Sequence, residues 1–200
     1  MEQVGQGTPR IRPAFTTAAR FQETFRAVLE AMSRPGKVLR SGATLEPPKP
    51  IPPALGAVCL TLLDFETPLW TDLPADGPAV RWLRFHCGVP PATTPGEAAF
   101  ALITQVKNLC PLGRFHPGEE ERPEQGATVM VQVGGLEAGA GWTLRGPGIE
   151  DTASLRVDGL APGFREERAA MEALFPLGLD FIFSAGEQLA ALPRTTRIEV

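Results

Sequence analysis

Proline and glycine restrict the fold of this chain more than any other residues, because each supplies 21 of its 200 positions. A proline removes a backbone N–H and fixes φ, and a glycine weakens a regular helix or strand. A bundle of long helices is therefore excluded. The sequence predicts many short elements that are joined by turns.

The rest of the composition is that of a globular protein. Hydrophobic residues make up 43% and charged residues 21%, which excludes a disordered or collagen-like chain. Because 23 acidic residues outweigh 19 basic ones, no overall positive field attracts nucleic acid. The longest apolar run, residues 54–63, is about half as long as a membrane-spanning helix. We therefore expect a cytoplasmic protein that binds neither nucleic acid nor membrane.

Cysteine usage also indicates a reducing compartment. Cys59, Cys87 and Cys110 are odd in number and widely spaced, and they form no Cys-x-x-Cys pair. Free thiols of this kind are typical of the cytoplasm. We expect neither a structural zinc nor an iron–sulfur cluster held by this chain alone, so the sequence predicts no metal site.

Apolar periodicity and turn residues divide the chain into short elements. A helical spacing of apolar residues from Phe21 to Met32 predicts a helix over 18–33, and Pro35-Gly36 would end it. Residues 1–15 are predicted to be a flexible leader, and residues 16–200 a single α/β domain with a mixed sheet. The other predicted elements are helices at 53–63 and 162–175, strands at 68–71, 99–104, 128–133 and 142–145, and a hairpin over 179–192.

Two segments are predicted to be irregular. Residues 45–53 contain five prolines, which predicts an extended surface connector. Residues 110–125 are rich in proline, glycine and glutamate, which predicts a long exposed loop that can face a partner.

Signatures of the common self-contained enzymes are absent from the sequence. It has no P-loop for phosphate, no strand-linked Gly-x-Gly-x-x-Gly, no Gly-x-Ser-x-Gly nucleophile elbow and no His-Glu-x-x-His zinc helix. With only His86 and His116, the chain is also poor in general bases that work near pH 7. We therefore predict no catalytic residues.

The segment 81–87 carries the first candidate ligand residues. As a strand, it would place Arg84 and His86 on one face, where a guanidinium and an imidazole can hold an anion together. As a helix, it would turn the two side chains about 200° apart and exclude that site. The alternative roles are structural, with Arg84 in an ion pair and His86 hydrogen-bonded at an element end.

The second candidate segment follows the predicted hairpin. Arg194, Thr195 and Thr196 offer a guanidinium and two hydroxyls directly after a strand, where α/β sheets often bind ligands. These groups suit a phosphate, a phosphonate or a carboxylate. The alternative is an ion pair between Arg194 and a protein carboxylate.

Two further turns complete the set of candidates. The turn 144–149 contains Arg145, Gly146 and Gly148, and it either exposes backbone amides to an anion or forms a plain hairpin turn. Asp180 follows a turn at 175–179, where it would hold a ligand, cap backbone amides or pair with an arginine. Neither turn decides between these alternatives on sequence alone.

Six segments in this order and spacing resemble the PhnH family, the H subunits of bacterial carbon–phosphorus lyase core complexes. The resemblance covers almost all of the chain from residue 21 to residue 200. The leader, the proline-rich connector, the loop 110–125 and the three cysteines fall outside it. The matching segments are Phe21–Arg26, Ala31–Gly36, Leu83–His86, Arg145–Ile149, Phe175–Asp180 and Leu192–Thr196.

The resemblance implies a role in phosphonate catabolism within an assembly of G, H, I and J subunits, with a functional link to an ABC-type L subunit. In that pathway a phosphonate displaces adenine from ATP and gives a ribose 1-phosphonate 5-triphosphate, with the I subunit as the catalytic one. The J subunit later breaks the C–P bond with an iron–sulfur cluster, so the cluster and ATP belong to the partners or to the shared reaction. The resemblance also implies a homodimer in isolation.

The fold implied by the resemblance is an α/β/α sandwich similar to pyridoxal-phosphate-dependent transferases. Those enzymes bind the cofactor as a Schiff base on a lysine, beside a carboxylate that pairs with the ring nitrogen. Lys37 follows a helix stop, Lys49 lies between prolines, and Lys107 begins a short helix or loop. Because none has a suitable context, we expect the fold without the cofactor lysine and without pyridoxal phosphate.

Two functions of different classes are consistent with these residues. The first is a non-catalytic but required subunit of the phosphonate-processing complex. The second is a stand-alone protein or enzyme that binds a small anion with Arg84, His86, Arg145 and Arg194. Convergence of those four side chains on one cleft would favour the second function, and their scatter among separate ion pairs would leave the first.

Overall fold

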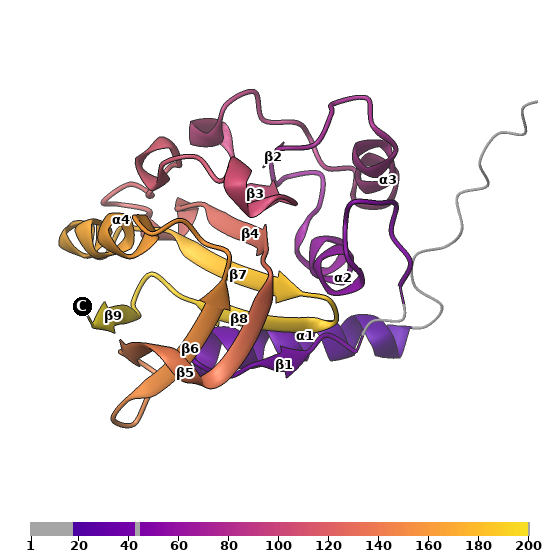
Figure 1. Cartoon of the computed structure of the whole chain (residues 1–200). Coiled ribbons are helices and arrows are strands. Elements are labelled where there is room, and N and C mark those ends of the chain that lie inside the picture. The colour runs from indigo at the N-terminus through magenta and orange to yellow at the C-terminus, as the bar shows by residue number, and fades with distance from the viewer. Residues whose placement is uncertain (1–17, 43–44, 200) are drawn as a thin grey trace, which may run out of the picture.

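A six-stranded mixed sheet forms the centre of the molecule (Figure 1). The computed structural model describes residues 18–42 and 45–199, so the predicted leader at 1–15 lies outside the described residues. The spatial order of the strands is β1 (Leu39–Arg40), β8 (Gln188–Leu192), β7 (Asp180–Ala185), β4 (Thr128–Gln132), β3 (Phe100–Ile103) and β2 (Leu69–Thr71). Neighbouring strands β2, β3, β4 and β7 run parallel, whereas β8 runs antiparallel to both its neighbours. The predicted α/β class with a mixed sheet is confirmed.

Three helices cover one face of this sheet. They are α1 (Ala18–Ser33), α2 (Pro53–Leu62) and α3 (Pro78–Cys87). The second helix is apolar all round and buries residues 54–59, and it starts with Pro53 because a missing N–H costs nothing in a first turn. The helices share an apolar cluster with sheet residues that include Leu102, Met130 and Ile182.

A small antiparallel sheet and one short helix cover the opposite face, where a sandwich of the α/β/α type has only helices. The small sheet has the order β6 (Ala153–Asp158), β5 (Gly135–Arg145) and β9 (Arg197–Glu199). Beside it, α4 (Phe164–Ala170) continues into a 3-10 turn at Met171–Leu174. The sequence predicted only the end of β5, because three glycines in that strand lower its strand propensity.

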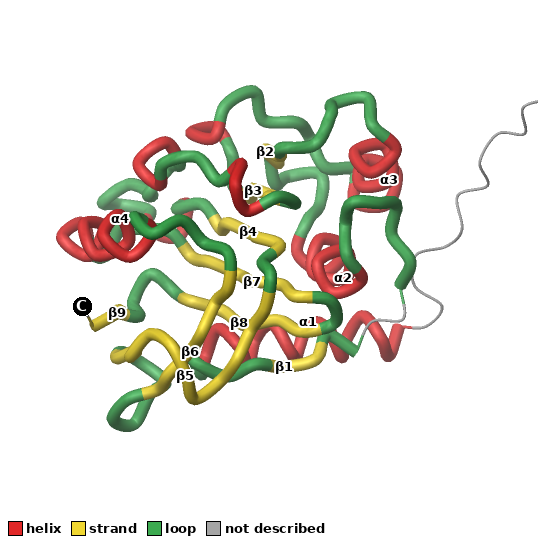
Figure 2. Tube along the Cα trace, in the orientation of Figure 1, coloured by secondary structure: helices red, strands yellow, loops and turns green. Residues whose placement is uncertain are grey.

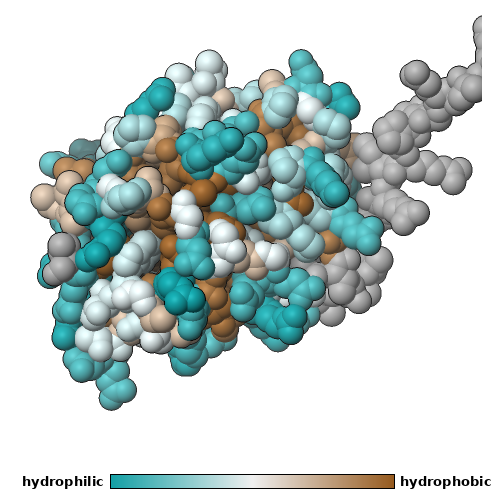
Figure 3. Space-filling view, in the orientation of Figure 1, coloured by the Kyte–Doolittle hydropathy of each residue, from teal (hydrophilic) through white to brown (hydrophobic). Residues whose placement is uncertain are grey.

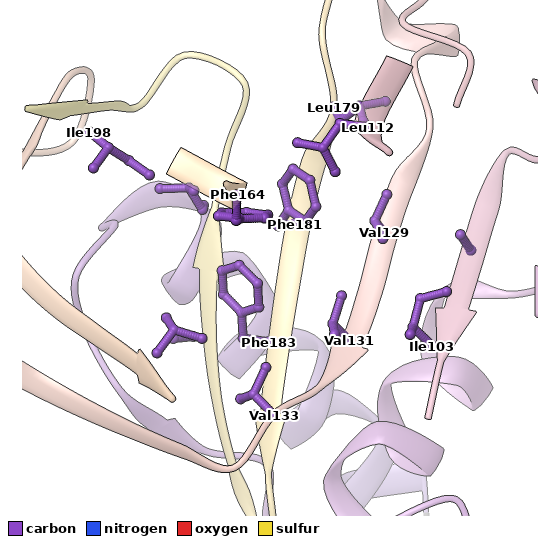
Figure 4. Close-up of a cluster of buried hydrophobic side chains, with 14 of the residues drawn as sticks. Ile103, Leu112, Val129, Val131, Val133, Phe164, Leu179, Phe181, Phe183 and Ile198 are labelled. Carbon is purple, nitrogen blue, oxygen red and sulfur yellow. The ribbon is translucent and has the colours of Figure 1, made fainter. Parts of the chain in front are cut away.

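Alternating side chains of β7 divide between the two faces of the central sheet. Ile182 belongs to the helical face, and Phe181 and Phe183 belong to the other face. The two phenylalanine rings stack with centroids 5.8 Å apart, and Phe164 of α4 meets Phe181 edge-on at 5.2 Å (Figure 4). Burial stabilises each such side chain by about 1.5–3 kcal/mol. This aromatic core therefore holds α4 and the small sheet against the central sheet.

Most predicted elements occur at the expected positions. The helix predicted at 18–33 is α1, and the predicted hairpin is β7 with β8. The loop predicted at 110–125 is mostly irregular and contains two 3-10 turns. Figure 2 shows that irregular segments link the short elements. The 3-10 turns of the described chain are Pro95–Glu97, Val106–Asn108, Leu112–Arg114, Pro123–Gln125 and Met171–Leu174.

The face drawn in Figure 3 is mainly hydrophilic but carries exposed apolar groups. On the face drawn in Figure 3, apolar residues reach the surface along a band through its middle. Phe25 and Leu29, one turn apart on α1, have exposed fractions of 43% and 51%. Within residues 18–42 and 45–199, no helix combines the length and the apolar character needed to cross a bilayer.

Candidate functional site

The candidate residues lie in two separate places. Arg84 and His86 are on α3, at the helical face of the central sheet. Arg145 and Arg194 border a cavity beside the small sheet, at the opposite face. The four side chains therefore do not converge on one cleft. The hypothesis of a single Arg/His pocket requires such convergence, so the geometry does not support it.

Residues 81–87 are helical, which decides between the alternatives for Arg84 and His86. The two side chains point about 200° apart around α3, so they do not hold an anion together. The His86 ring meets the rings of Trp82 and Phe85 edge-on, with centroids 5.1 and 5.0 Å away. Its buried Nε2 has no hydrogen-bond partner among the described residues, and burial lowers the pKa of His86. Arg84 borders a different cavity, of about 190 Å³.

Asp180 and Arg194 form a largely buried ion pair. Arg194 Nη2 lies 2.6 Å from Asp180 Oδ2, and the Arg194 backbone N–H donates to Oδ1 at 2.7 Å. The same guanidinium donates to the carbonyls of Pro123 and Gly126. These bonds join the start of β7, the end of β8 and the turn before β4. The structural alternative for both residues is the one that the geometry supports.

A buried arginine that the sequence analysis missed fixes the loop after β8. Arg168 of α4 is 1% exposed, and its Nη2 donates to the carbonyls of Pro193 and Thr196 at 2.9 and 3.0 Å. Burial lowers the pKa of Arg168. The helical offset from Phe164 to Arg168 to Met171 puts all three on one buried face, and that spacing was the available signal. Thr196 is fully buried, so its hydroxyl does not face a ligand in solvent.

The turn 144–149 packs tightly against its surroundings. Its Ile149 N–H donates to the carbonyl of Gly146 at 3.2 Å, which is the pattern of a plain turn. Gly148 has φ +81°, and a Cβ there would overlap the carbonyl oxygen of Ser33 at the end of α1. A Cβ on Gly146 would lie 2.7 Å from the Thr195 carbonyl oxygen. Both glycines are therefore explained by close packing of the backbone.

Four candidate residues nevertheless border one cavity of about 290 Å³. The cavity is also lined by Arg197 of β9 and by Glu172 of the 3-10 turn after α4, and Figure 1 shows β9 beside α4. The Arg145 guanidinium donates to Glu199 and to Asp151, and these two carboxylates raise its pKa. The sequence analysis did not single out Phe175 or Arg197 as ligand residues, but both border the cavity. The residues around it are Arg145, Gly146, Pro147, Glu172, Phe175, Arg194, Thr195 and Arg197.

The three lysines lie apart from one another, and the cavity beside Lys107 is mainly apolar. Lys37 pairs on the surface with Glu30 at 2.9 Å, and Lys49 is exposed. Lys107 borders a mainly apolar cavity of about 430 Å³, where the Glu167 carboxylate accepts the Leu112 N–H at 2.6 Å. In the part of the chain that the structure describes, no three His, Cys, Asp or Glu side chains are placed to hold a metal ion.

Comparison with known proteins connects this architecture to one family. A family model described as bacterial phosphonate metabolism protein (PhnH) matches residues 13–199. The ribose 1-methylphosphonate 5-triphosphate synthase subunit PhnH of Rhizobium meliloti (strain 1021) is 36% identical over 180 residues, which are 89% of this chain and 90% of that protein. HtxG of Stutzerimonas stutzeri, named as a C-P lyase subunit protein, is 36% identical over 184 residues, or 92% and 88% of the two chains. With a family match over nearly its whole length, this chain belongs to the PhnH family of bacterial phosphonate metabolism proteins.

Proposed function

We propose that the chain is a non-catalytic but required subunit of a carbon–phosphorus lyase complex. Within that complex, a phosphonate and ATP are converted into a ribose 1-phosphonate 5-triphosphate and adenine. The observation that carries this proposal is the family match over residues 13–199, together with two relatives that carry subunit names and align over about nine-tenths of their length.

The environment of the reactive side chains supports a non-catalytic role. Asp180 and Arg194 use their charges on each other and on backbone groups. His86 faces aromatic rings instead of a nucleophile. Burial raises the pKa of the Cys59 thiol, and it raises the pKa of the Cys87 thiol to about 11. Both thiols therefore stay protonated at neutral pH.

The proposal includes a fold related to pyridoxal-phosphate-dependent transferases that works without their cofactor. Lys37 is held by Glu30 on the surface, and Lys49 is exposed. Lys107 is exposed and borders the same cavity as Glu167, whose carboxylate accepts the Leu112 N–H. A Schiff base needs a lysine beside a carboxylate that is free to pair with the pyridine ring. The surroundings of these three lysines therefore support the proposal that the chain binds no pyridoxal phosphate.

The proposed partners are the G, I and J subunits of the core complex, with a functional link to the L subunit in the cytoplasm. The isolated chain is proposed to form a homodimer. Phe25 and Leu29 form an exposed apolar stripe on α1, which supports protein contacts. When a partner covers apolar groups at neighbouring positions of a surface helix, the free energy of the complex is lowered. Iron–sulfur chemistry and ATP are assigned to the partners.

The test is co-expression of the tagged chain with the other subunits of a phosphonate gene cluster, followed by mass determination of the purified product. We expect a stoichiometric complex, and we expect the isolated chain to have no absorbance near 400 nm, where a pyridoxal Schiff base absorbs. Removal of this chain should abolish growth of the host on a phosphonate as its sole phosphorus source. Turnover of phosphonate by the isolated chain, or failure to join the complex, would contradict the proposal.

A further inference from the structure

We infer that a cavity between β2 and α3 binds the carboxy-terminal residue of a protein chain that ends in an aliphatic side chain. That side chain fills the cavity, the terminal carboxylate pairs with Arg84, and the peptide backbone lies along the free edge of β2. The inference goes beyond the proposed subunit role and does not depend on it. Hereafter this site is called the β2 edge cavity. Its walls include Leu69, Thr71, Leu73, Val80, Leu83 and Arg84.

The β2 edge cavity is small, and its inner walls are apolar. Leu69 of β2 is buried, as are Val80 and Leu83 of α3. The volume of about 190 Å³ lies below the usual range of sites for drug-sized ligands. The cavity therefore suits one aliphatic side chain better than a larger organic molecule. Removal of such a side chain from water favours binding.

Arg84 borders this cavity and has no partner in the protein. Val80 and Arg84 are four positions apart in α3, so their side chains lie on the same face of the helix. Arg84 is exposed, and within residues 18–42 and 45–199 it forms no side-chain hydrogen bond or ion pair. Its neighbour Arg81 differs, because Nη1 of Arg81 donates to the Asp76 carbonyl at 2.7 Å. A guanidinium with free N–H groups matches the two oxygens of a carboxylate.

The strand β2 is the last strand of the central sheet, so one of its sides has no neighbouring strand (Figure 1). In a parallel ladder, alternate residues direct their backbone groups to opposite sides. Asp72 faces β3, because its N–H donates to the Leu102 carbonyl. The backbone groups of Leu69 and Thr71 therefore point to the free side, where the β2 edge cavity lies.

The segment 90–92 covers only part of that free side. The Leu69 N–H donates to the Pro90 carbonyl, and the Ala92 N–H donates to the Leu69 carbonyl, both at 2.9 Å. In the part of the chain that the structure describes, the backbone N–H and C=O of Thr71 have no corresponding partner on this side. Unpaired backbone groups at a sheet edge can add an extended peptide, and an adjoining pocket then selects its side chain.

These three features together select the end of a polypeptide. A carboxy-terminal residue joins a peptide N–H, a side chain and a carboxylate at one carbon atom, so it can meet Thr71, the apolar walls and Arg84 at once. A residue inside a chain has no carboxylate on its backbone and leaves Arg84 unpaired. An acidic side chain in the cavity would lose its hydration against apolar walls.

The test is fluorescence polarisation of the full chain with labelled hexapeptides that share a glycine–serine spacer and differ only in their last residue. We expect saturable binding of the peptide that ends in leucine with a free carboxylate. The leucine amide should bind about tenfold more weakly, as expected for the loss of a charged hydrogen bond. A peptide that ends in aspartate should also bind about tenfold more weakly, because it puts a charge against the apolar walls. Methylation of the last peptide nitrogen should weaken binding as well.

The Arg84→Gln variant should bind the free leucine peptide no better than the amide. The matched control is Arg81→Gln, which removes one positive charge one helical turn away and should bind as the wild-type chain does. Equal losses in the two variants would overturn the inference, because they would show general charge attraction only. Circular dichroism of both variants separates these results from loss of folding.

Three further results would contradict the inference. Absence of saturable binding in the wild-type chain would overturn it. Equal affinity for 4-methylpentanoate, which has the side chain and the carboxylate but no peptide bond, would show a site for small carboxylic acids instead. Unchanged affinity for the N-methylated peptide would show that its backbone does not pair with the edge of β2.

Discussion

Among the charged candidate residues, Arg194 makes hydrogen bonds to the most widely separated segments of the chain. It reaches Asp180 at the start of β7 and the carbonyls of Pro123 and Gly126 before β4. Both members of the ion pair have a side-chain exposure of 14%. Because the pair is largely removed from water, the loss of one partner leaves the other charge uncompensated.

We therefore predict that Arg194→Ala lowers the free energy of unfolding by about 3 kcal/mol. The control, Lys107→Ala, removes an exposed cation that has no ion pair within the described residues, and it should change that free energy by less than about 0.5 kcal/mol. Urea unfolding of both variants measures the difference. For the same reason Arg194→Ala should impair phosphonate turnover by the complex more than Lys107→Ala. Equal turnover in the two variants would contradict this prediction.

His86 gives a prediction about pH. Burial lowers its pKa in the folded chain below the value of about 6.5 in the unfolded chain, so protonation favours unfolding. Its contribution to stability is complete above pH 6.5 and is lost as the pH falls through the lower, folded pKa. The wild-type protein should therefore lose more unfolding free energy between pH 8 and pH 5 than His86→Gln. Urea unfolding at both pH values checks this, and equal losses in the two proteins would refute it.

At the scale of elements, the turn between β5 and β6 lies directly against the end of α1. Gly148 lies against the last residue of that helix, Ser33, with no room for a side chain. Gly139, in the bulged part of β5, has nearly the same φ, +79°, but has open space around it. The two glycines therefore separate the cost of backbone conformation from the cost of crowding.

We predict that Gly139→Ala lowers the free energy of unfolding by about 1–2 kcal/mol, the cost of a left-handed backbone. Gly148→Ala should cost the same amount and about 1–3 kcal/mol more, because the turn must move away from α1. Thermal unfolding of the two variants compares them directly. If both lose the same stability, the contact between the turn and α1 is not tight.

Elements with their own periodicity or turn chemistry could be predicted from the sequence, and elements that depend on distant pairing could not. The helical spacing from Phe21 to Met32 is local, and so is the hairpin turn between β7 and β8. The strand β5 is rich in glycine and forms because β6 and β9 lie on either side of it. The local pattern of residues 81–87 also did not decide between a strand and a helix for that segment.

The residues of the candidate site also divide into those that the local sequence predicts and those that it does not. Arg145 and Arg194 were found because they follow or end predicted strands. Arg197 was missed because β9 has three residues and shows no alternation long enough to predict a strand. Its position opposite Arg145 is a matter of register between segments more than fifty residues apart, which no local pattern records.

At the scale of the whole molecule, β7 is shared by both apolar cores. Ile182 and Phe183 are adjacent in sequence but belong to opposite faces of the central sheet. A strand that serves two cores couples them, so loss of one core removes support from the other.

We predict that Ile182→Ala and Phe183→Ala each lower the free energy of unfolding by about 2–5 kcal/mol. Both variants should still unfold in one cooperative transition. Trp82 reports on the helical face and Trp142 on the opposite face, so tryptophan fluorescence samples both cores. Its midpoint should coincide with that of far-ultraviolet circular dichroism, and separate midpoints would show that the two cores unfold independently.

The pairing of β1 with β8 also determines when the protein can be completed during its synthesis. Arg40 of β1 forms an ion pair with Glu187, directly before β8, and the two residues are 147 positions apart. The helix α1 also packs beside β8. At about 5–20 residues per second, a ribosome needs about 7 to 30 seconds to make the chain between Arg40 and Glu187. During that interval α1 has no β8 to pack against, so the first helix reaches its final packing only after almost the whole chain has been made.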